Sequence, residues 1–178
     1  MMKIRQSNTS DASAIARVRV ESWRAAYRGI VPDDFLDGMD AAQWADGYRR
    51  FLENRPDRLV SFVAEVDGTI VGMAAAGPNR DDDTPYSAEL FLIYLLPGYW
   101  RRGIGLKLVD ATARSLIDLG LSSMIVWVLA ENWPARRFYE ALGGRYFRKR
   151  STDIAGSPLQ EVSYGWAALS ALIRQDQR

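Results

Sequence analysis

The chain has 178 residues, of which 48% are hydrophobic, enough for one domain with its own core. Its 23 Lys and Arg against 22 Asp and Glu leave a net charge of +1, which creates no overall field for nucleic acid or an anionic membrane. The absence of Cys and His excludes a thiolate nucleophile, a Ser-His-Asp triad, a typical zinc site and a disulfide framework. We therefore expect a single domain over residues 1–178, with no metal and neither a nucleic-acid nor a membrane partner.

The first residues, Met1 to Gln6, contain no apolar signal core, and no run of eighteen apolar residues occurs along the sequence. A cytoplasmic protein is the simplest expectation. Residues 2–6 are typical of a short strand, and the polar stretch 8–11 offers helix caps before an amphipathic helix. A second helix is predicted around Trp44 to Leu52, ending before Pro56.

From Leu59 the pattern changes to strands. Residues 60–66 and 69–73, joined by Asp67-Gly68, predict a hairpin with a two-residue turn. A polar loop over residues 78–87 follows, and then an apolar strand over residues 88–96 with one charge near its start, Glu89. We expect this strand to lie centrally in a sheet.

The last part of the chain alternates helices and strands. A helix from Gly105 ends at Gly120, and residues 124–129 predict a buried strand. A short helix from Pro134 to Leu142 precedes two strand candidates at residues 145–150 and 160–166. The order of elements predicts one mixed α/β (α+β) domain.

Between the central strand and the next helix the sequence contains Pro97-Gly98-Tyr99-Trp100-Arg101-Arg102-Gly103-Ile104-Gly105. Glycines let a backbone pass close to a ligand, and a helix starting there directs unpaired N–H groups and its positive dipole end at an anion. The pattern therefore indicates a phosphate cradle. Glycines that serve only the turn are the alternative.

One strand further on stands Asn132-Trp133-Pro134-Ala135-Arg136-Arg137-Phe138-Tyr139, in which Ala135 and Tyr139 share a helix face. This segment, the glycine turn and the element order together resemble the GNAT superfamily of acyl-CoA-dependent N-acetyltransferases over residues 2–166. The resemblance implies a mixed, mostly antiparallel sheet of six to seven strands flanked by about four helices. It also implies acetyl-CoA as co-substrate.

The resemblance assigns cofactor-binding residues to three segments. The family's phosphate loop falls on Trp100 to Gly105, although Trp100 replaces the usual Gln or Arg. Leu95 and Leu96 match the strand edge that pairs with the pantetheine arm, and Asn132 and Tyr139 would contact the pantetheine and the sulfur. The implied cofactor-binding residues are Leu95, Leu96, Trp100, Arg101, Arg102, Gly103, Ile104, Gly105, Asn132, Ala135 and Tyr139.

Acetyl transfer to an amine requires a base, an oxyanion donor and an acid for the leaving thiolate. We expect Glu89, the backbone N–H of Leu95 and Tyr139 in these catalytic roles. A phenol with a reference pKa near 10 stays protonated at neutral pH and can donate to sulfur. Glu89 has an alternative role as a strand-end charge or a member of a structural ion pair.

Trp23 and Tyr27 would line the acceptor pocket in one subgroup of the family, although their helical spacing also suits a core face. The acidic run Asp81 to Asp83 could attract a cationic amine or could simply be solvated. The basic stretch 148–150 fits an exposed strand better than nucleic-acid binding.

The predicted function is transfer of an acetyl group from acetyl-CoA to a primary amine, of a small molecule or a peptide, by direct attack in a ternary complex. A non-catalytic acyl-CoA sensor is the alternative. A homodimer is left open, with Trp44 and Trp166 as aromatic residues expected to be exposed.

Overall fold

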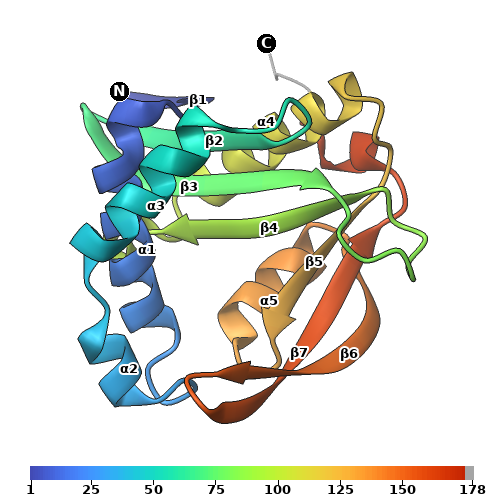
Figure 1. The fold of residues 1–178 in the computed structure, drawn as a ribbon. Coiled ribbons are helices and arrows are strands. Elements are labelled where there is room, and N and C mark those ends of the chain that lie inside the picture. The colour runs from blue at the N-terminus through green and yellow to red at the C-terminus, as the bar shows by residue number, and fades with distance from the viewer. Residues whose placement is uncertain (175–178) are drawn as a thin grey trace.

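The computed structural model describes residues 1–174, and its centre is a seven-stranded sheet in the order β1-β2-β3-β4-β5-β7-β6 (Figure 1). All neighbouring strands are antiparallel except β4 and β5. The predicted mixed, mostly antiparallel architecture is therefore confirmed. The helices and strands in chain order are β1 (Met2–Gln6), α1 (Ala12–Ala26), α2 (Asp33–Gly38), α3 (Ala41–Glu53), β2 (Val60–Val66), β3 (Thr69–Pro78), β4 (Ala88–Leu95), α4 (Ile104–Asp118), β5 (Met124–Leu129), α5 (Trp133–Ala141), β6 (Arg145–Ile154) and β7 (Ser157–Trp166).

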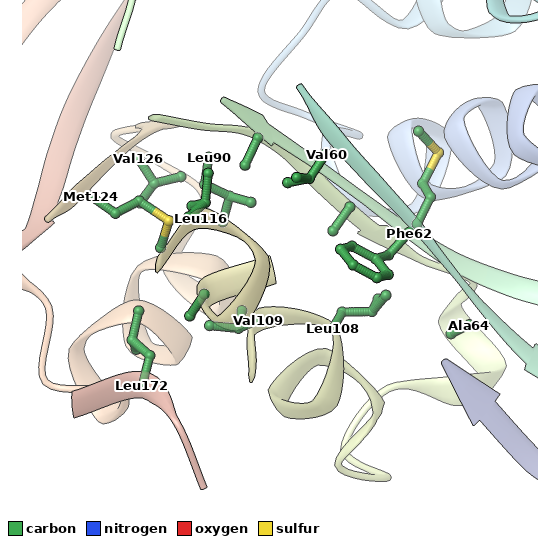
Figure 2. Close-up of a cluster of buried hydrophobic side chains, with 14 of the residues drawn as sticks. Val60, Phe62, Ala64, Leu90, Leu108, Val109, Leu116, Met124, Val126 and Leu172 are labelled. Atoms are coloured by element: carbon green, nitrogen blue, oxygen red, sulfur yellow. The ribbon is translucent and has the colours of Figure 1, made fainter. Parts of the chain in front are cut away.

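The sheet has α4 packed on one face, where strands β2, β4 and β5 contribute buried apolar side chains. Figure 2 shows Leu108, Val109 and Leu116 of α4 against side chains of these strands, including Phe62 and Leu90. Helices α1, α2 and α3 lie together at one side of the molecule, drawn in blue and cyan in Figure 1. The central strand β4 thus has helices on both faces.

Local sequence features explain where several elements begin and end. The Asp40 side chain accepts a hydrogen bond from the Ala42 N–H and caps α3. Asn132 caps α5 in the same way, with a proline in the first turn. The hairpin turn at Asp67 and Gly68 has φ of 48° and 81°, the left-handed pair that a tight type I′ turn requires.

The pairing of β4 changes part-way along the strand. Leu90 lies opposite Ala76 and Leu92 opposite Ala75, so Phe91 is an extra residue that bulges out of the ladder. On its other side β4 pairs with β5 only from Ala88 to Leu90. Beyond the bulge, β4 and β5 are no longer hydrogen-bonded neighbours.

Three features differ from the sequence-based expectation. Within the described residues there are five α-helices, because the six-residue α2 follows the break at residues 29–32. The last two strands extend to ten residues each and form a hairpin. Trp166 is only 3% exposed and its indole N–H donates to the Leu142 carbonyl, while Trp44 is half-buried, so the expectation that both are exposed was wrong.

No helix within residues 1–174 is long and apolar enough to span a membrane.

The polar loop over residues 78–87 is fastened to β7 by Tyr86, whose ring covers Gly165. A Cβ at Gly165 would overlap that ring, so we expect Gly165→Ala to destabilise the protein by about 1–3 kcal/mol in urea denaturation. Gly47→Ala is the matched control, because Gly47 faces open space inside α3 and alanine there should stabilise by up to about 1 kcal/mol. Equal stability of the Gly165 variant and wild type would contradict the packing.

Candidate active site

The backbone of β4 after the bulge has free hydrogen-bonding groups on the side facing away from β3. The N–H of Leu96 donates to the Val71 carbonyl at 2.9 Å. In an antiparallel ladder, hydrogen-bonded and non-hydrogen-bonded residue pairs alternate along the strand. The residues of a non-hydrogen-bonded pair have their N–H and C=O groups turned away from the partner strand. The register places Leu95 and Ile93 at such positions. Because the β4–β5 ladder ends at Leu90, the N–H groups of Ile93 and Leu95 face the side where β5 has diverged.

This orientation changes one expectation about the strand edge. The N–H of Leu96 was expected to pair with a ligand, but it is already bonded to β3, and the Leu96 carbonyl accepts from the Tyr99 N–H at 2.9 Å. Ile93 was not singled out from the sequence. Only the position of the bulge, which depends on pairing with β3, reveals that its N–H points outward.

The carbonyl of Leu95 is held by two donors from different parts of the chain. The Ser22 hydroxyl of α1 donates to it at 2.9 Å, and the Trp100 indole N–H donates at 2.8 Å. These bonds tie the end of β4 both to α1 and to the glycine turn. Trp100, 42% exposed, therefore has a positioning contact of its own.

The glycine turn leads directly into α4. Gly103 is the residue before the helix and has φ of 75°, and Arg101 has φ of 59°. Both lie in the left-handed region, which glycine adopts far more readily than other residues. The first N–H groups of α4 have no carbonyl partner within the helix. Since Arg101 and Arg102 are exposed beside them, the turn presents amides and positive charge together.

The N-terminus of α4 is closed on its other side by α5. A Cβ at Gly105 would lie 3.2 Å from the Phe138 ring, so a glycine permits this close contact. The Asn132 side-chain oxygen accepts from the Ala135 N–H at 3.3 Å. Tyr139, one turn beyond the half-buried Ala135, is 5% exposed. The two motifs found in the sequence thus adjoin one another.

The Tyr139 phenol is held in its neutral form. Burial raises its pKa well above the ordinary value of about 10, and the charge of Tyr94, were it ionised, would raise the pKa further. Tyr139 therefore keeps its proton throughout the neutral range. A buried phenol that stays protonated can donate a hydrogen bond, and then its proton, to a negative charge that develops beside it.

Aromatic residues from α1 and β4 form a wall next to Tyr139. The rings of Trp23 and Tyr27 meet edge to face at 4.9 Å between centroids, and Trp23 lies 6.5 Å from Tyr94. Burial raises the pKa of Tyr27, with the nearby Tyr94 and Tyr139 adding to the shift and a hydrogen bond from Asn132 opposing it. The structure thus brings Trp23 and Tyr27 together with Asn132 and Tyr139.

Glu89 lies at the start of β4 and is 4% exposed. Arg80 donates to both of its carboxylate oxygens, from Nη2 at 2.6 Å and from Nε at 2.9 Å. This is the ion pair that the sequence left open as an alternative to a catalytic role. Four residue steps at about 3.3 Å separate Glu89 from Ile93, roughly 13 Å along the strand.

The acidic run in the loop after β3 is also paired. Arg148 of β6 binds both Asp81 and Asp83, the latter at 3.2 Å. A hydrogen bond from the Asp83 N–H keeps the pKa of Asp81 below its usual value, and the interaction with Arg148 adds to this effect. The two carboxylates are therefore partly neutralised, which weakens their attraction for a cationic amine.

Sequence reasoning missed a second carboxylate, Glu161 of β7. It lies opposite Leu129 of β5 and accepts from the Arg150 Nε at 2.7 Å. Its charge makes a minor contribution to the raised pKa of Tyr27, so it lies near the aromatic wall. No motif contains Glu161, and only the pairing of β7 with β5 brings it there.

Within residues 1–174 no cluster of three or more Asp and Glu side chains could hold a metal ion.

Comparisons with known proteins agree with this geometry. The family described as acetyltransferase (GNAT) matches residues 19–144. The chain is 36% identical to the uncharacterised N-acetyltransferase YuaI of Bacillus subtilis strain 168, over 97% of this chain and 96% of that protein. It is 30% identical to aminoglycoside N(6')-acetyltransferase type 1 of Salmonella typhimurium, over 84% and 99% of the two chains.

A solved structure shows the same fold. The putative acetyltransferase yncA from Salmonella typhimurium, determined with its cofactor acetyl-CoA, superposes with a TM-score of 0.70 at 20% identity, covering 94% of each chain. The family match spans most of the chain, and the similarity to YuaI spans nearly all of it. The chain therefore belongs to the acetyltransferase (GNAT) family and is an acyltransferase.

Proposed function

We propose that this enzyme transfers an acetyl group from acetyl-CoA to a primary amine by direct attack in a ternary complex. The observation that carries the proposal is the strand edge of β4, where the N–H groups of Ile93 and Leu95 face outward on either side of Tyr94, a residue close enough to the buried Tyr139 to affect its pKa. The family membership supports acyl transfer, and the yncA structure was solved with acetyl-CoA.

The free backbone groups fit an extended pantetheine arm, which would take the place of a neighbouring strand along β4. Ile93 and Leu95 are the residues whose N–H groups would pair with it, in place of Leu95 and Leu96. The amides around Gly103 and Gly105, with Arg101 and Arg102, would hold the pyrophosphate.

The residues of the chain divide the chemistry between them. An N–H of Ile93 or Leu95 stabilises the negative charge that develops on the thioester carbonyl oxygen as the amine attacks. Tyr139 gives its proton to the departing thiolate. Because Glu89 lies roughly 13 Å along the strand from Ile93, it takes a proton from the amine through a chain of waters, for which it must release one hydrogen bond from Arg80.

The acceptor would enter along the wall formed by Trp23, Tyr27 and Tyr94. Since the aminoglycoside acetyltransferase is a relative by sequence, a small-molecule amine is the class of acceptor that we propose. Lysine-like amines have a reference pKa of about 10.4 and are mostly protonated at pH 7, so a proton acceptor near this wall is required.

Tyr139→Phe tests the proposal at its centre. Wild-type protein should bind acetyl-CoA in calorimetry and release free thiol with at least one amine of a panel. Tyr139→Phe should lower turnover about 10²-fold while the acetyl-CoA Kd changes by less than about threefold, because only the proton donor is lost. Binding without thiol release for every amine would favour a sensor, and unchanged turnover would remove Tyr139 as the acid.

Gly103→Ala tests the phosphate loop. Alanine at φ of 75° is strained by about 1–2 kcal/mol, so the loop should leave its present conformation and the acetyl-CoA Kd should rise about tenfold. Gly98→Ala is the matched control in the same turn, because Gly98 faces open space and does not have a positive φ. The acetyl-CoA Kd of this variant should equal that of wild type. Equal affinity of both variants would contradict the assignment.

Glu89→Gln and Arg80→Gln together separate a base from a structural ion pair. If Glu89 is the base, Glu89→Gln should lower kcat/KM about tenfold or more, most strongly at low pH. Arg80→Gln removes the cation that binds the Glu89 carboxylate, so it should also lower kcat/KM if Glu89 is the base. Similar losses of stability in both variants, with unaltered pH profiles, would leave only the structural role.

A further inference from the structure

The guanidinium of Arg19 lies between two indole rings at the junction of α1 and α3. Its central carbon lies 4.0 Å from the ring centroid of Trp44 and 5.2 Å from that of Trp23. Its Nη1 donates to the Tyr48 hydroxyl at 3.2 Å. Both ring contacts are within cation–π range and help to hold the guanidinium in place.

One edge of the guanidinium has no partner among residues 1–174. The Nε of Arg19 is buried without a hydrogen-bond acceptor, and the buried indole N–H of Trp23 has no acceptor other than the nearby Tyr94 phenol. No carboxylate of the described chain forms an ion pair with Arg19. Buried donors and charges without partners are unfavourable, which makes this cluster unlike an ordinary structural arginine.

These donors lie next to the catalytic end of β4. Arg19 precedes Ser22 by three residues on α1, which is close to one helical turn of about 5.4 Å. Ser22 contacts the Leu95 carbonyl. Burial raises the pKa of Tyr94 overall, whereas the positive charge of Arg19 and a hydrogen bond from the Trp23 indole N–H act in the opposite direction. Arg19 and Trp23 therefore both lie close to that phenol. The cluster therefore borders the place where the amine would attack.

A planar carboxylate fits this arrangement. With Nη1 engaged by Tyr48, Nε and Nη2 form the remaining fork of the guanidinium. Because Nε is buried, the side chains around it must shift for a ligand to reach it. Such a fork binds the two oxygens of a carboxylate through parallel hydrogen bonds. The Trp23 N–H supplies another donor nearby.

We propose that Arg19 and Trp23 form an anion subsite and that the acceptor is a small amino acid, carrying a carboxylate within a few bonds of the amine that is acetylated. The inference rests on the proposed function and adds the substrate class. Arg19 binds the carboxylate, while the amine faces the β4 edge near Leu95. An acceptor without a negative charge would leave the guanidinium desolvated and unpaired, and would bind less well.

The test compares free amino acids with their carboxamides, which keep the amine and the side chain but lose the negative charge. Thiol release from acetyl-CoA and melting temperature in the presence of coenzyme A are measured with a panel of such pairs. Wild type should prefer at least one amino acid over its amide by tenfold or more in kcat/KM, and that amino acid should raise the melting temperature. Amides used as well as the acids would overturn the subsite.

Arg19→Gln should raise KM for the preferred amino acid about tenfold or more, change KM for its amide by less than threefold, and abolish the amino-acid-induced rise in melting temperature. Arg49→Gln is the control, because Arg49 is an exposed arginine of α3 that pairs only with Asp46. Loss of the Arg19 guanidinium could destabilise the packing of α1 against α3. Trp23→Phe is therefore a second variant, which keeps an aromatic ring and removes the indole N–H. A selective loss for the acid in either variant supports the subsite, whereas equal losses for acid and amide in both contradict it.

The two proposals fail in different ways. If acetyl-CoA does not bind in calorimetry, or no amine of either kind releases thiol, the acetyl-transfer function itself is wrong. If acetyl-CoA binds and amides or simple amines are acetylated without preference for a carboxylate, only the subsite is wrong.

Discussion

The bulge at Phe91 is the feature on which the whole site depends. It shifts the register of β4 against β3 by one residue, so that the N–H groups of Ile93 and Leu95 point away from β3. The parallel ladder with β5 ends at Leu90, so nothing in that ladder uses these groups. Strand groups without partners are normally a liability that proteins cover. Here they are covered by helices on both faces of the sheet and remain available only along the edge.

The charges around the site divide into paired and unpaired groups. Arg80 is bound to Glu89, Arg148 to the loop aspartates and Arg150 to Glu161. These pairs connect the loop after β3 to β4 and β6, and connect the two strands of the β6–β7 hairpin to each other. Arg19 differs from these arginines, because it is half-buried and forms no ion pair with a carboxylate of residues 1–174. On the proposed function, discrimination between acceptors would depend on Arg19 more than on the total charge of the chain.

Much of the fold could be predicted because its signals are local. The Asp67-Gly68 turn, the proline and asparagine at the start of α5 and the glycine turn each encode their own geometry within a few residues. The parts that were missed depend on contacts distant in sequence. The outward N–H of Ile93 requires the register with β3, and Glu161 reaches the site only through the pairing of β7 with β5. The burial of Trp166 follows likewise from packing against α5.

Trp100 illustrates how a departure from a motif can be compensated. Trp100 replaces the usual Gln or Arg of the phosphate loop, and its indole N–H donates to the Leu95 carbonyl. That same carbonyl accepts from Ser22, so one oxygen joins α1, β4 and the glycine turn. The bond fixes the direction of the Leu95 peptide, and with it the plane of the strand edge from which the neighbouring N–H groups project. On the proposed function, Trp100 would thus contribute to the position of the reacting thioester, and the amides after Arg101 would hold the phosphates.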